Sequence, residues 1–234
     1  MALSTAIPRL TDYYRRHGFA VTVRRAAVAV KRALFSGRSV LFYCDLATLA
    51  SPSGNLPSFM KVERKGSSSE LSPEDLDALT SFWNPRLAQR YIKERFGKGA
   101  SLWLIKSESG LVGYGWSLPG TTIEPHYFPL GPQDVHLFDF HVFPQYRGQG
   151  MNPLLVSHIL SRVATEAAGR AFIEAGEWNL AQLSSLSKTP FRFLGKARKL
   201  TIFGHAVVFW ADNEIKPQGT KVPVRDIDNH ANGH

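Results

Sequence analysis

The sequence predicts an α/β fold in which helices flank a sheet and a pair of helices extends the N-terminus. Two observations support this prediction. Of the 234 residues, 44% are hydrophobic and 20% are charged, which is the balance of a chain that buries a substantial core rather than of a disordered or fibrous one. Runs rich in β-branched and aromatic residues, typical of strands, also alternate with helix-like runs between residues 40 and 210.

The N-terminal segment is predicted to form two helices, at residues 8–18 and 19–35. The second helix ends at Ser36-Gly37, because glycine tolerates the conformation that closes a helix. Its apolar and basic side chains fall on opposite faces of the helix. The apolar face either packs on the domain or docks on a membrane or a partner.

The remaining elements are placed by local signals. Ser72 is an N-cap and Pro73 takes the first helical position. Four prolines mark residues 118–133 as a long loop, of the kind that is a substrate lid or disordered in compact domains. From residue 212 onward the chain is polar and aperiodic, which predicts a flexible tail. In order, we expect strands at 40–46 and 59–64, helices at 73–83 and 86–96, a hairpin of strands at 102–107 and 111–116, a strand at 135–143, a helix at 153–168, a strand at 171–175, a helix at 180–187, and strands at 191–198 and 200–210.

The composition excludes several classes of protein. The single cysteine, Cys44, rules out an intramolecular disulfide framework and a multi-cysteine metal centre. No run has the roughly 18 uninterrupted apolar residues of a membrane span. Residues 1–10 lack the pattern of a secretory signal, so we expect a cytoplasmic protein, with membrane association left open by the N-terminal helices.

The formal net charge of +9 is concentrated near the N-terminus. Residues 1–38 carry eight Lys and Arg residues and a single acidic residue, Asp12, so the rest of the chain is close to neutral. This location makes an acidic carrier protein or an anionic membrane surface a candidate partner of the N-terminal segment. Nucleic acid is disfavoured, because the body of the chain lacks an aromatic and basic stacking motif.

The segment from Phe140 to Pro153 is the most informative for function. A strand ends at Pro144, a glycine-rich turn follows, and Asn152 is predicted to be the N-cap of the next helix. Free backbone N–H groups in such a turn, at the positive end of a helix dipole, bind phosphate oxygens, and Arg147 adds a positive charge. The chain has no complete Walker motif or dinucleotide fingerprint. The segment therefore predicts an anion site of another kind.

This segment resembles the signature of the GNAT superfamily of acyl-CoA-dependent N-acyltransferases. The family pattern Val-x-Pro-x-Tyr-Arg-Gly-x-Gly is present from Val142 to Gly150, and Asn179 stands where the family has an Asn that contacts CoA. The resemblance extends over residues 59–210 and implies a mixed, mostly antiparallel sheet with acetyl-CoA, or another acyl-CoA, as co-substrate. It implies that the co-substrate is bound by Phe140, His141, Val142, Arg147, Gly148, Gln149, Gly150, Met151, Asn152 and Asn179.

Two positions depart from the family pattern. Asn152 replaces the usual Gly or Ala and, as a good N-cap, is expected to preserve the anion site. Leu186 stands where many members have the tyrosine that protonates the departing CoA thiolate. Four alternatives follow: Ser185 replaces the tyrosine, Ser187 replaces it, the thiolate leaves unassisted, or the domain binds CoA without catalysing transfer.

Candidate catalytic residues lie on the strand at 135–143. In the mechanism that the resemblance implies, a neutral amine attacks the thioester carbonyl, a backbone N–H stabilises the oxyanion, and a base takes the proton of the amine. His136 lies where some amine-acetylating members have a base histidine; the alternative is a histidine satisfied by backbone groups. Asp139 either acts as a base through water or binds a neighbouring loop or helix.

Strand alternation predicts which of these side chains share a face. It places His136, Phe138, Phe140 and Val142 on one face and Leu137, Asp139 and His141 on the other. Because His136 and His141 then point in opposite directions, we predict no metal site.

The acceptor is expected to be a small-molecule amine that contacts the proline-rich loop. Glu124, His126 and Tyr127 are the candidate contacts there, and Glu174 is a further carboxylate near the presumed cleft. The prediction is an acetyl-CoA-dependent N-acetyltransferase domain at 58–211, between a basic extension at 1–57 and a tail at 212–234. A longer acyl-CoA or an acyl carrier protein as donor, and a non-catalytic CoA-binding or interaction module, are the alternatives.

Overall fold

The computed structural model describes residues 23, 38–49, 56–81, 85–123, 126–166, 168–202 and 205–213. The helices predicted at 8–18 and 19–35 lie outside these residues, apart from Val23, which is helical. The tail beyond residue 213 and Glu124, a predicted acceptor contact, also lie outside them.

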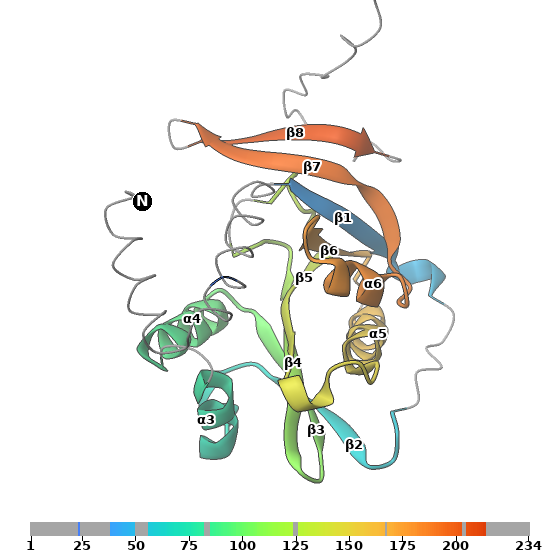
Figure 1. Ribbon diagram of the computed structural model, residues 1–234. Helices are drawn as coiled ribbons and strands as arrows, with labels where there is room; N and C mark the ends of the chain where they lie inside the picture. Colours follow the sequence, from blue (N-terminus) through green and yellow to red (C-terminus); the bar gives the residue numbers. More distant parts are fainter. Residues whose placement is uncertain are drawn as a thin grey trace, which may run out of the picture.

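Within the described part of the chain, eight strands form one sheet in the order β2-β3-β4-β5-β6-β1-β7-β8 (Figure 1). Neighbouring strands are antiparallel except for β5 and β6, which are parallel. The predicted mixed, mostly antiparallel sheet is therefore confirmed. The strands are β1 (Arg38–Asp45), β2 (Met60–Lys65), β3 (Ser101–Ser107), β4 (Gly110–Pro119), β5 (Asp134–Val142), β6 (Arg170–Gly176), β7 (Arg192–Ile202) and β8 (His205–Asn213).

Helices cover both faces of this sheet (Figure 1). On one side lie α3 (Pro73–Ser81) and α4 (Pro85–Gly97), and on the other lie α5 (Met151–Ala164) and α6 (Leu180–Leu186). Ser72 Oγ accepts a hydrogen bond from the backbone N–H of Asp75 at 3.1 Å, as its predicted role at the start of α3 requires. The described residues also form three short 3₁₀ helices, η2 (Leu46–Thr48), η3 (Ser68–Glu70) and η4 (Pro144–Tyr146). None of the helices described is both long and apolar enough to span a membrane.

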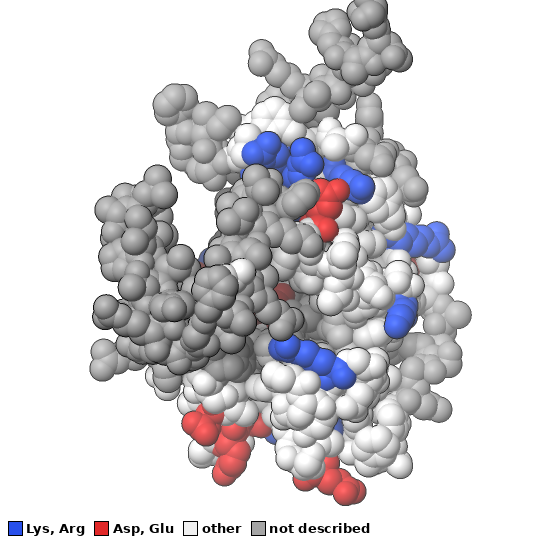
Figure 2. All heavy atoms as spheres, viewed as in Figure 1, with Lys and Arg blue, Asp and Glu red and all other residues white. Residues whose placement is uncertain are grey.

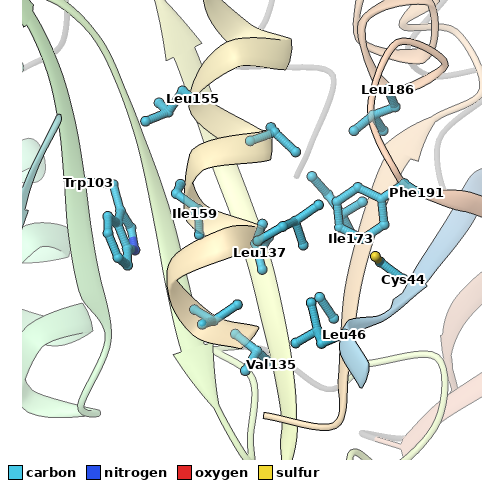
Figure 3. Close-up of a cluster of buried hydrophobic side chains, with 14 of the residues drawn as sticks. Cys44, Leu46, Trp103, Val135, Leu137, Leu155, Ile159, Ile173, Leu186 and Phe191 are labelled. Atoms are coloured by element: carbon cyan, nitrogen blue, oxygen red, sulfur yellow. The ribbon is translucent and has the colours of Figure 1, made fainter. Parts of the chain in front are cut away.

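Of three hydrophobic clusters among the described residues, two hold the helices against the sheet. In the first core, Ile159 of α5 packs with Leu137 of β5 and Ile173 of β6, and Leu186 of α6 points into the same cluster (Figure 3). The second core lies under α3 and α4, where Leu79 and Ile92 pack on β3 and β4; its strand residues include Leu102, Leu104, Tyr114 and Trp116. The sheet is thus covered on both faces, which fixes the positions of the loops at its edges.

Strand β1 is an interior strand of the sheet. It pairs antiparallel with β6 on one side and with β7 on the other, and its side chains Leu41 and Cys44 are buried. The sequence analysis assigned this strand to an N-terminal extension, but its hydrogen bonds join it to the sheet of the predicted acyltransferase domain. The last hairpin also differs from the prediction. A break between two strands was expected at Lys199, but β7 pairs with β8 through this position and ends at Ile202.

The parallel pair formed by β5 and β6 is short. Asp134–His136 pairs with Arg170–Phe172, after which β5 continues along β4 and β6 continues along β1. The two strands therefore part toward their carboxyl ends. Since α5 follows β5, this opening lies beside the start of α5.

A bulge interrupts β5 at Asp139. The residue has φ +51°, an uncommon value for a side chain other than glycine, and the pairing with β4 shifts register between Tyr114 and Trp116. Phe138 packs against the second core, whereas Phe140 packs against the first. The predicted uniform alternation along this strand is therefore wrong beyond Phe138, because the extra residue of the bulge moves Phe140 to the opposite face.

Candidate functional site

The turn between β5 and α5 contains the predicted anion site. Gly148 and Gly150 have φ values of +78° and +76°, and a Cβ at either position would meet no atom within 4 Å. The left-handed backbone, rather than crowding, therefore favours glycine at both positions. In the described part of the chain, the N–H groups of Gly148, Gly150 and Met151 have no hydrogen-bond partner. These N–H groups are available to an anionic ligand.

The side chain of Arg147 is hydrogen-bonded to the end of β5. Its Nε donates a hydrogen bond to the carbonyl oxygen of Val142 at 3.0 Å, and the side chain is otherwise exposed. This bond holds the guanidinium beside the glycine turn. Gln149 points back instead, with its Nε2 donating to the carbonyl oxygen of Gln145 at 3.2 Å.

Asn152 connects two helices. Helix α5 begins at Met151 with Gly150 as its N-cap residue, so the prediction that Asn152 is the N-cap is wrong. Its Nδ2 donates to Ser185 Oγ at 2.8 Å and to Gln182 Oε1 at 3.3 Å, both on α6. Its Oδ1 is buried without a hydrogen-bond partner among the described residues. The side chain thus joins α5 to α6 instead of closing its own helix.

These elements enclose an open cleft of about 400 Å³. Its walls are the end of β5, the glycine turn, the start of α5 and helix α6. Of the residues predicted to bind the co-substrate, all except Gln149 line it, and Ser185 lines it as well. The lining residues are Phe140, His141, Val142, Tyr146, Arg147, Gly148, Gly150, Met151, Asn152, Pro153, Asn179, Ala181, Gln182, Ser184, Ser185 and Lys188.

Helix α6 presents polar groups to the cleft and an apolar group to the core. Asn179 caps it, with Oδ1 accepting from the N–H of Gln182 at 3.2 Å. Because Ser185 Oγ already accepts a hydrogen bond from Asn152, its own O–H is left to donate. Leu186 is 0% exposed and lies in the first core (Figure 3). Position 185, rather than 186, therefore faces the cleft.

His141 contributes a neutral imidazole to the cleft. Its ring stacks on Tyr114, with centroids 5.6 Å apart and planes inclined by 21°. Burial, with a further effect from the Arg147 cation, lowers the pKa of His141 below its ordinary value of 6.5. At neutral pH this side chain adds no charge to the site.

Asp139 does not line the cleft. Its carboxylate accepts a hydrogen bond from the guanidinium of Arg95 on α4, and the two groups form an ion pair. Arg95 in turn lies over the rings of Trp116 and Phe138, at 5.1 and 5.4 Å from their centroids. Of the two roles considered for Asp139, the structure thus provides the contact with a neighbouring helix.

His136 and Glu174 form a hydrogen-bonded pair where β5 and β6 part. His136 is 5% exposed, and its Nε2 lies 2.8 Å from Glu174 Oε2. The partner of His136 is therefore a carboxylate rather than the backbone. His126 joins the group from the proline-rich loop, with its Nδ1 3.9 Å from the same oxygen and its ring 4.9 Å from that of His136. Burial lowers the pKa of His126 to about 4.

Tyr127 connects the proline-rich loop to β1. Its hydroxyl group is 2.6 Å from Ser39 Oγ, to which it donates a hydrogen bond, and its ring is buried beside Leu41 and Phe172. Burial raises the pKa of Tyr127. Tyr127 thus packs in the interior, although it was predicted to contact the acceptor.

A second open groove, of about 380 Å³, runs over β1, β7 and β8. Arg38, Lys196 and Arg198 line it together with Phe209 and Trp210. Figure 2 shows Lys and Arg side chains gathered in the upper part of the molecule, at the level of β7 in Figure 1, while acidic side chains lie mainly at the lower end. None of the predicted catalytic or binding residues lines this groove.

Comparison with known proteins identifies the domain that forms the cleft. The model of the acetyltransferase (GNAT) family matches residues 69–184. Residues 69–184 belong to the GNAT family. The matched region contains the glycine turn, Arg147 and Asn179, and it ends immediately before Ser185 and Leu186. The position at which the general acid was expected therefore lies just outside the GNAT match.

Solved structures share the GNAT fold at low sequence identity. The tandem GNAT protein from the clavulanic acid biosynthesis pathway, solved without acetyl-CoA, has a TM-score of 0.50 and 12% identity over 68% of this chain and 51% of that one. A GNAT-family acetyltransferase from Colwellia psychrerythraea has a TM-score of 0.46 and 15% identity over 68% of this chain and 53% of that one. The aligned region thus spans about half of each of these structures. No curated protein sequence matches this chain significantly.

Several residues of the cleft were not predicted from the sequence. Gln182 and Lys188 line it from α6 and the residues after it, and Tyr146 lines it from η4. A helical spacing of three from Asn179 leads to 182 and 185, so the sequence contained a signal for Gln182. Arg95, the partner of Asp139, comes from a separate helix, and no local pattern links the two residues.

Proposed function

We propose that the protein is an acyl-CoA-dependent N-acyltransferase that transfers an acetyl group from acetyl-CoA to the amine of a small molecule. The observation that carries the proposal is the cleft of about 400 Å³ into which the glycine turn, Arg147, Asn179 and Ser185 converge. Membership of residues 69–184 in the GNAT family supports the reaction class. The proposal goes beyond the family match where it names acetyl as the transferred group and a small molecule as the acceptor.

The glycine turn has the donors that a pyrophosphate requires. The N–H groups of Gly148, Gly150 and Met151 lie at the positive end of α5, and Arg147 is held beside them by its bond to Val142. Both glycines also leave open space where a side chain would otherwise stand. These residues would bind the phosphates, with Arg147 supplying a charge-assisted hydrogen bond.

The parting of β5 and β6 provides a place for an extended chain. Beyond His136, β5 no longer pairs with β6, and residues 140–142 line the cleft. Backbone groups on that edge of β5 would position the pantetheine arm, in the way that a sheet edge holds an added strand. We assign this role to Phe140, His141 and Val142.

Acetyl-CoA supplies an activated thioester. The bulge at Asp139 displaces the backbone of β5 from regular pairing, and we assign an N–H group of this segment to the oxyanion of the attacked carbonyl. His136 would take the proton of the acceptor amine. Ser185, whose O–H is left to donate, would protonate the departing sulfur. Leu186 has no part in the reaction, because it is buried in the core.

Two measurements test the proposed function. Thermal unfolding is followed in the presence of acetyl-CoA, CoA and a series of longer acyl-CoA molecules, and a CoA-release assay is run on a diverse amine library with mass analysis of the products. We expect acetyl-CoA to raise the unfolding temperature and at least one primary amine to be acetylated. If CoA is released only from longer acyl-CoA molecules, the transferred group is a longer acyl chain rather than acetyl. Stabilisation without release from any amine would favour a non-catalytic CoA-binding module.

A further inference from the structure

The pair formed by His136 and Glu174 lies at a specific point of the fold. His136 is the last residue of β5 that pairs with β6, and Glu174 lies two residues beyond the last paired residue of β6. The bond of 2.8 Å between His136 Nε2 and Glu174 Oε2 therefore spans the two strands where they begin to separate. The ring of His136 also stacks on Phe138, with centroids 5.2 Å apart and planes inclined by 17°. Two contacts thus fix the orientation of the imidazole.

The other ring nitrogen of His136 is unsatisfied. Nδ1 is buried and has no hydrogen-bond partner among the described residues. Burial by itself raises the pKa of Glu174, but His136, through its charge and its hydrogen bond, holds that pKa below its ordinary value. An ionised carboxylate accepts only, so Nε2 donates the bond of 2.8 Å whether His136 is charged or neutral. A neutral His136 must then carry its proton on Nε2, which leaves a lone pair on Nδ1.

We propose that Glu174 is a positioning residue that holds His136 in the Nε2–H tautomer, so that Nδ1 is the atom that takes the proton of the acceptor amine. This inference rests on the proposed function and deepens it. As the amine nitrogen bonds to the thioester carbonyl carbon, its N–H bond breaks and the proton passes to Nδ1. The resulting imidazolium is stabilised by the Glu174 carboxylate, as in a Ser-His-Asp triad but with the roles of the two ring nitrogens exchanged. The carbon–sulfur bond then breaks, and CoA leaves as the thiolate that Ser185 would protonate.

The charges around the pair suit this role. His126 is the nearest titratable neighbour; its low pKa keeps it neutral, so it does not oppose a positive charge on His136. Lys199 lies over the ring of Tyr127, 5.1 Å from its centroid, and is the cation that acts on both His126 and Glu174. With Glu174 included, these are the charged and titratable groups that the described residues place around His136.

A divalent metal is the competing explanation for the same cluster. One atom each of His126, His136 and Glu174 lie within 4.8 Å of one another, and two imidazoles with a carboxylate are common zinc ligands. Two observations favour the acid–base role. The bond of 2.8 Å leaves no space for an ion between Nε2 and Oε2. Metal-bound histidines also donate their second N–H to a neighbouring group, whereas His126 Nε2 and His136 Nδ1 have no such partner among the described residues.

Nitrogen NMR of the full-length protein tests the tautomer without any substrate. Spectra of ¹⁵N-histidine-labelled protein distinguish protonated from unprotonated ring nitrogens, and a His136→Gln variant assigns the signals. We expect Nε2 of His136 to carry the proton in the wild type and the Glu174→Gln variant to give a mixture of tautomers. A proton on Nδ1 in the wild type would overturn the proposal, whatever the enzyme is found to acylate.

Kinetics test the role of Glu174 in transfer. With an amine accepted by the wild type, Glu174→Gln is expected to lower kcat about tenfold to a hundredfold while the affinity for acetyl-CoA is unchanged. Glu174→Asp, which keeps the carboxylate, should retain more of kcat. Glu177→Gln, three residues further on, is the matched control and should resemble the wild type.

The pH profile separates this role from a merely structural one. A variant that only disturbs the structure should lower kcat by the same factor at every pH, whereas loss of the carboxylate should change the pH dependence of kcat. Wild-type kcat in Glu174→Gln, or turnover that chelation abolishes and Zn²⁺ restores, would refute the proposal. If neither the wild type nor any variant transfers an acyl group, while His136 of the wild type has the Nε2–H tautomer, the proposed function is refuted and the positioning role is not.

Discussion

Arg147 brings its charge to the glycine turn through a single hydrogen bond to Val142. Replacement by alanine removes both the charge and the tethered donor. Because a hydrogen bond to a charged group contributes roughly 1.5–3 kcal/mol, Arg147→Ala should weaken acetyl-CoA binding by about tenfold to a hundredfold. Isothermal titration calorimetry measures this change, with the exposed Arg90 of α4 replaced by alanine as control. Equal affinities of the two variants for acetyl-CoA would show that Arg147 does not contribute to acetyl-CoA binding.

Ser185 and Leu186 are adjacent in sequence but differ in environment. Ser185 lines the cleft, whereas Leu186 is buried in the first core. Ser185→Ala should therefore lower kcat, and because it removes a hydrogen-bond acceptor of Asn152 it should lower the free energy of unfolding by about 1 kcal/mol. Leu186→Tyr, which restores the residue found in many GNAT members, should overfill the core and lower the free energy of unfolding by about 1–3 kcal/mol. Urea denaturation and turnover assays measure both effects; faster turnover in Leu186→Tyr would contradict this account.

Individual site residues were predictable from the sequence where the chemistry is local. The spacing of Arg147, Gly148 and Gly150 in one turn predicted an anion site, and the structure puts these residues in one cleft. The contacts of Asn152 and Asp139 were not predictable, because their partners, Ser185 and Arg95, lie on other elements. Glu174 was noted as a carboxylate near the cleft, but only the pairing of β5 with β6 brings it to His136.

At the level of elements, the bulge of β5 depends on close packing with β4. A Cβ on Gly115 would lie 2.4 Å from Phe140 Cε1, so an added methyl group must displace a ring that lines the cleft. Gly115→Ala is expected to lower the free energy of unfolding by about 1–3 kcal/mol and to weaken acetyl-CoA binding. Gly97→Ala is the control, because a Cβ there meets no atom within 4 Å. Calorimetric titration and urea denaturation of both variants test the prediction.

An ion-pair network joins β2 to β3 and α3. Lys61, Lys65 and Lys106 each lie within 3.2 Å of the Glu63 carboxylate, and Lys106 also lies 2.7 Å from Asp75 on α3. The hydrogen bond from Lys61 and those from Lys106 and Lys65, acting against burial, hold the pKa of Glu63 at about 2. Since this pKa lies below the ordinary 4.5 of the unfolded chain, the stabilisation is complete above pH 4.5 and is lost as the pH falls toward 2.

Glu63→Gln tests this network. Allowing for solvent screening, we expect the variant to lose about 1 kcal/mol of unfolding free energy at pH 7. The difference from the wild type should shrink as the pH falls from 4.5 toward 2. Urea denaturation across that range measures it, with the more exposed Glu94→Gln as a control expected to change little at any pH. A difference that is constant with pH would assign the effect to packing rather than to charge.

Most helices and strands were predictable because their signals are local, whereas one feature of the sheet and one helix start were not. Ser72-Pro73 correctly started α3, and the hydrophobic runs located β3, β4 and β5. The bulge at Asp139 escaped prediction because it arises from pairing with β4, and a regular strand was the simplest assumption. The start of α5 was misplaced by two residues, because Gly150 adopts the cap position that Asn152 also suits.

For the whole molecule, the position of β1 predicts which truncations fold. Removal of residues 1–37 leaves every strand of the sheet, so the shortened protein should keep its near-ultraviolet circular dichroism and elute as a compact species. Removal of residues 1–46 deletes β1, leaves β6 and β7 each without the strand between them, and opens the core at Leu41, Cys44 and Leu46. That protein should lose its tertiary signal and aggregate. A folded chain that begins at residue 47 would contradict the importance of β1 for the sheet.

The insertion of β1 between β6 and β7 also constrains the order in which the protein can fold. Asp45 pairs with Arg170, and Arg38 pairs with Arg198, so β1 leaves the ribosome long before its partners are synthesised. Pairings this distant in sequence carry a large entropic cost of loop closure and slow the folding of a domain. The antiparallel strands β2, β3 and β4 can pair early, while both edges of β1 are still unpaired. Closure of the sheet, and with it the alignment of β6 against β5 that joins Glu174 to His136, can be completed only after β7 has been synthesised.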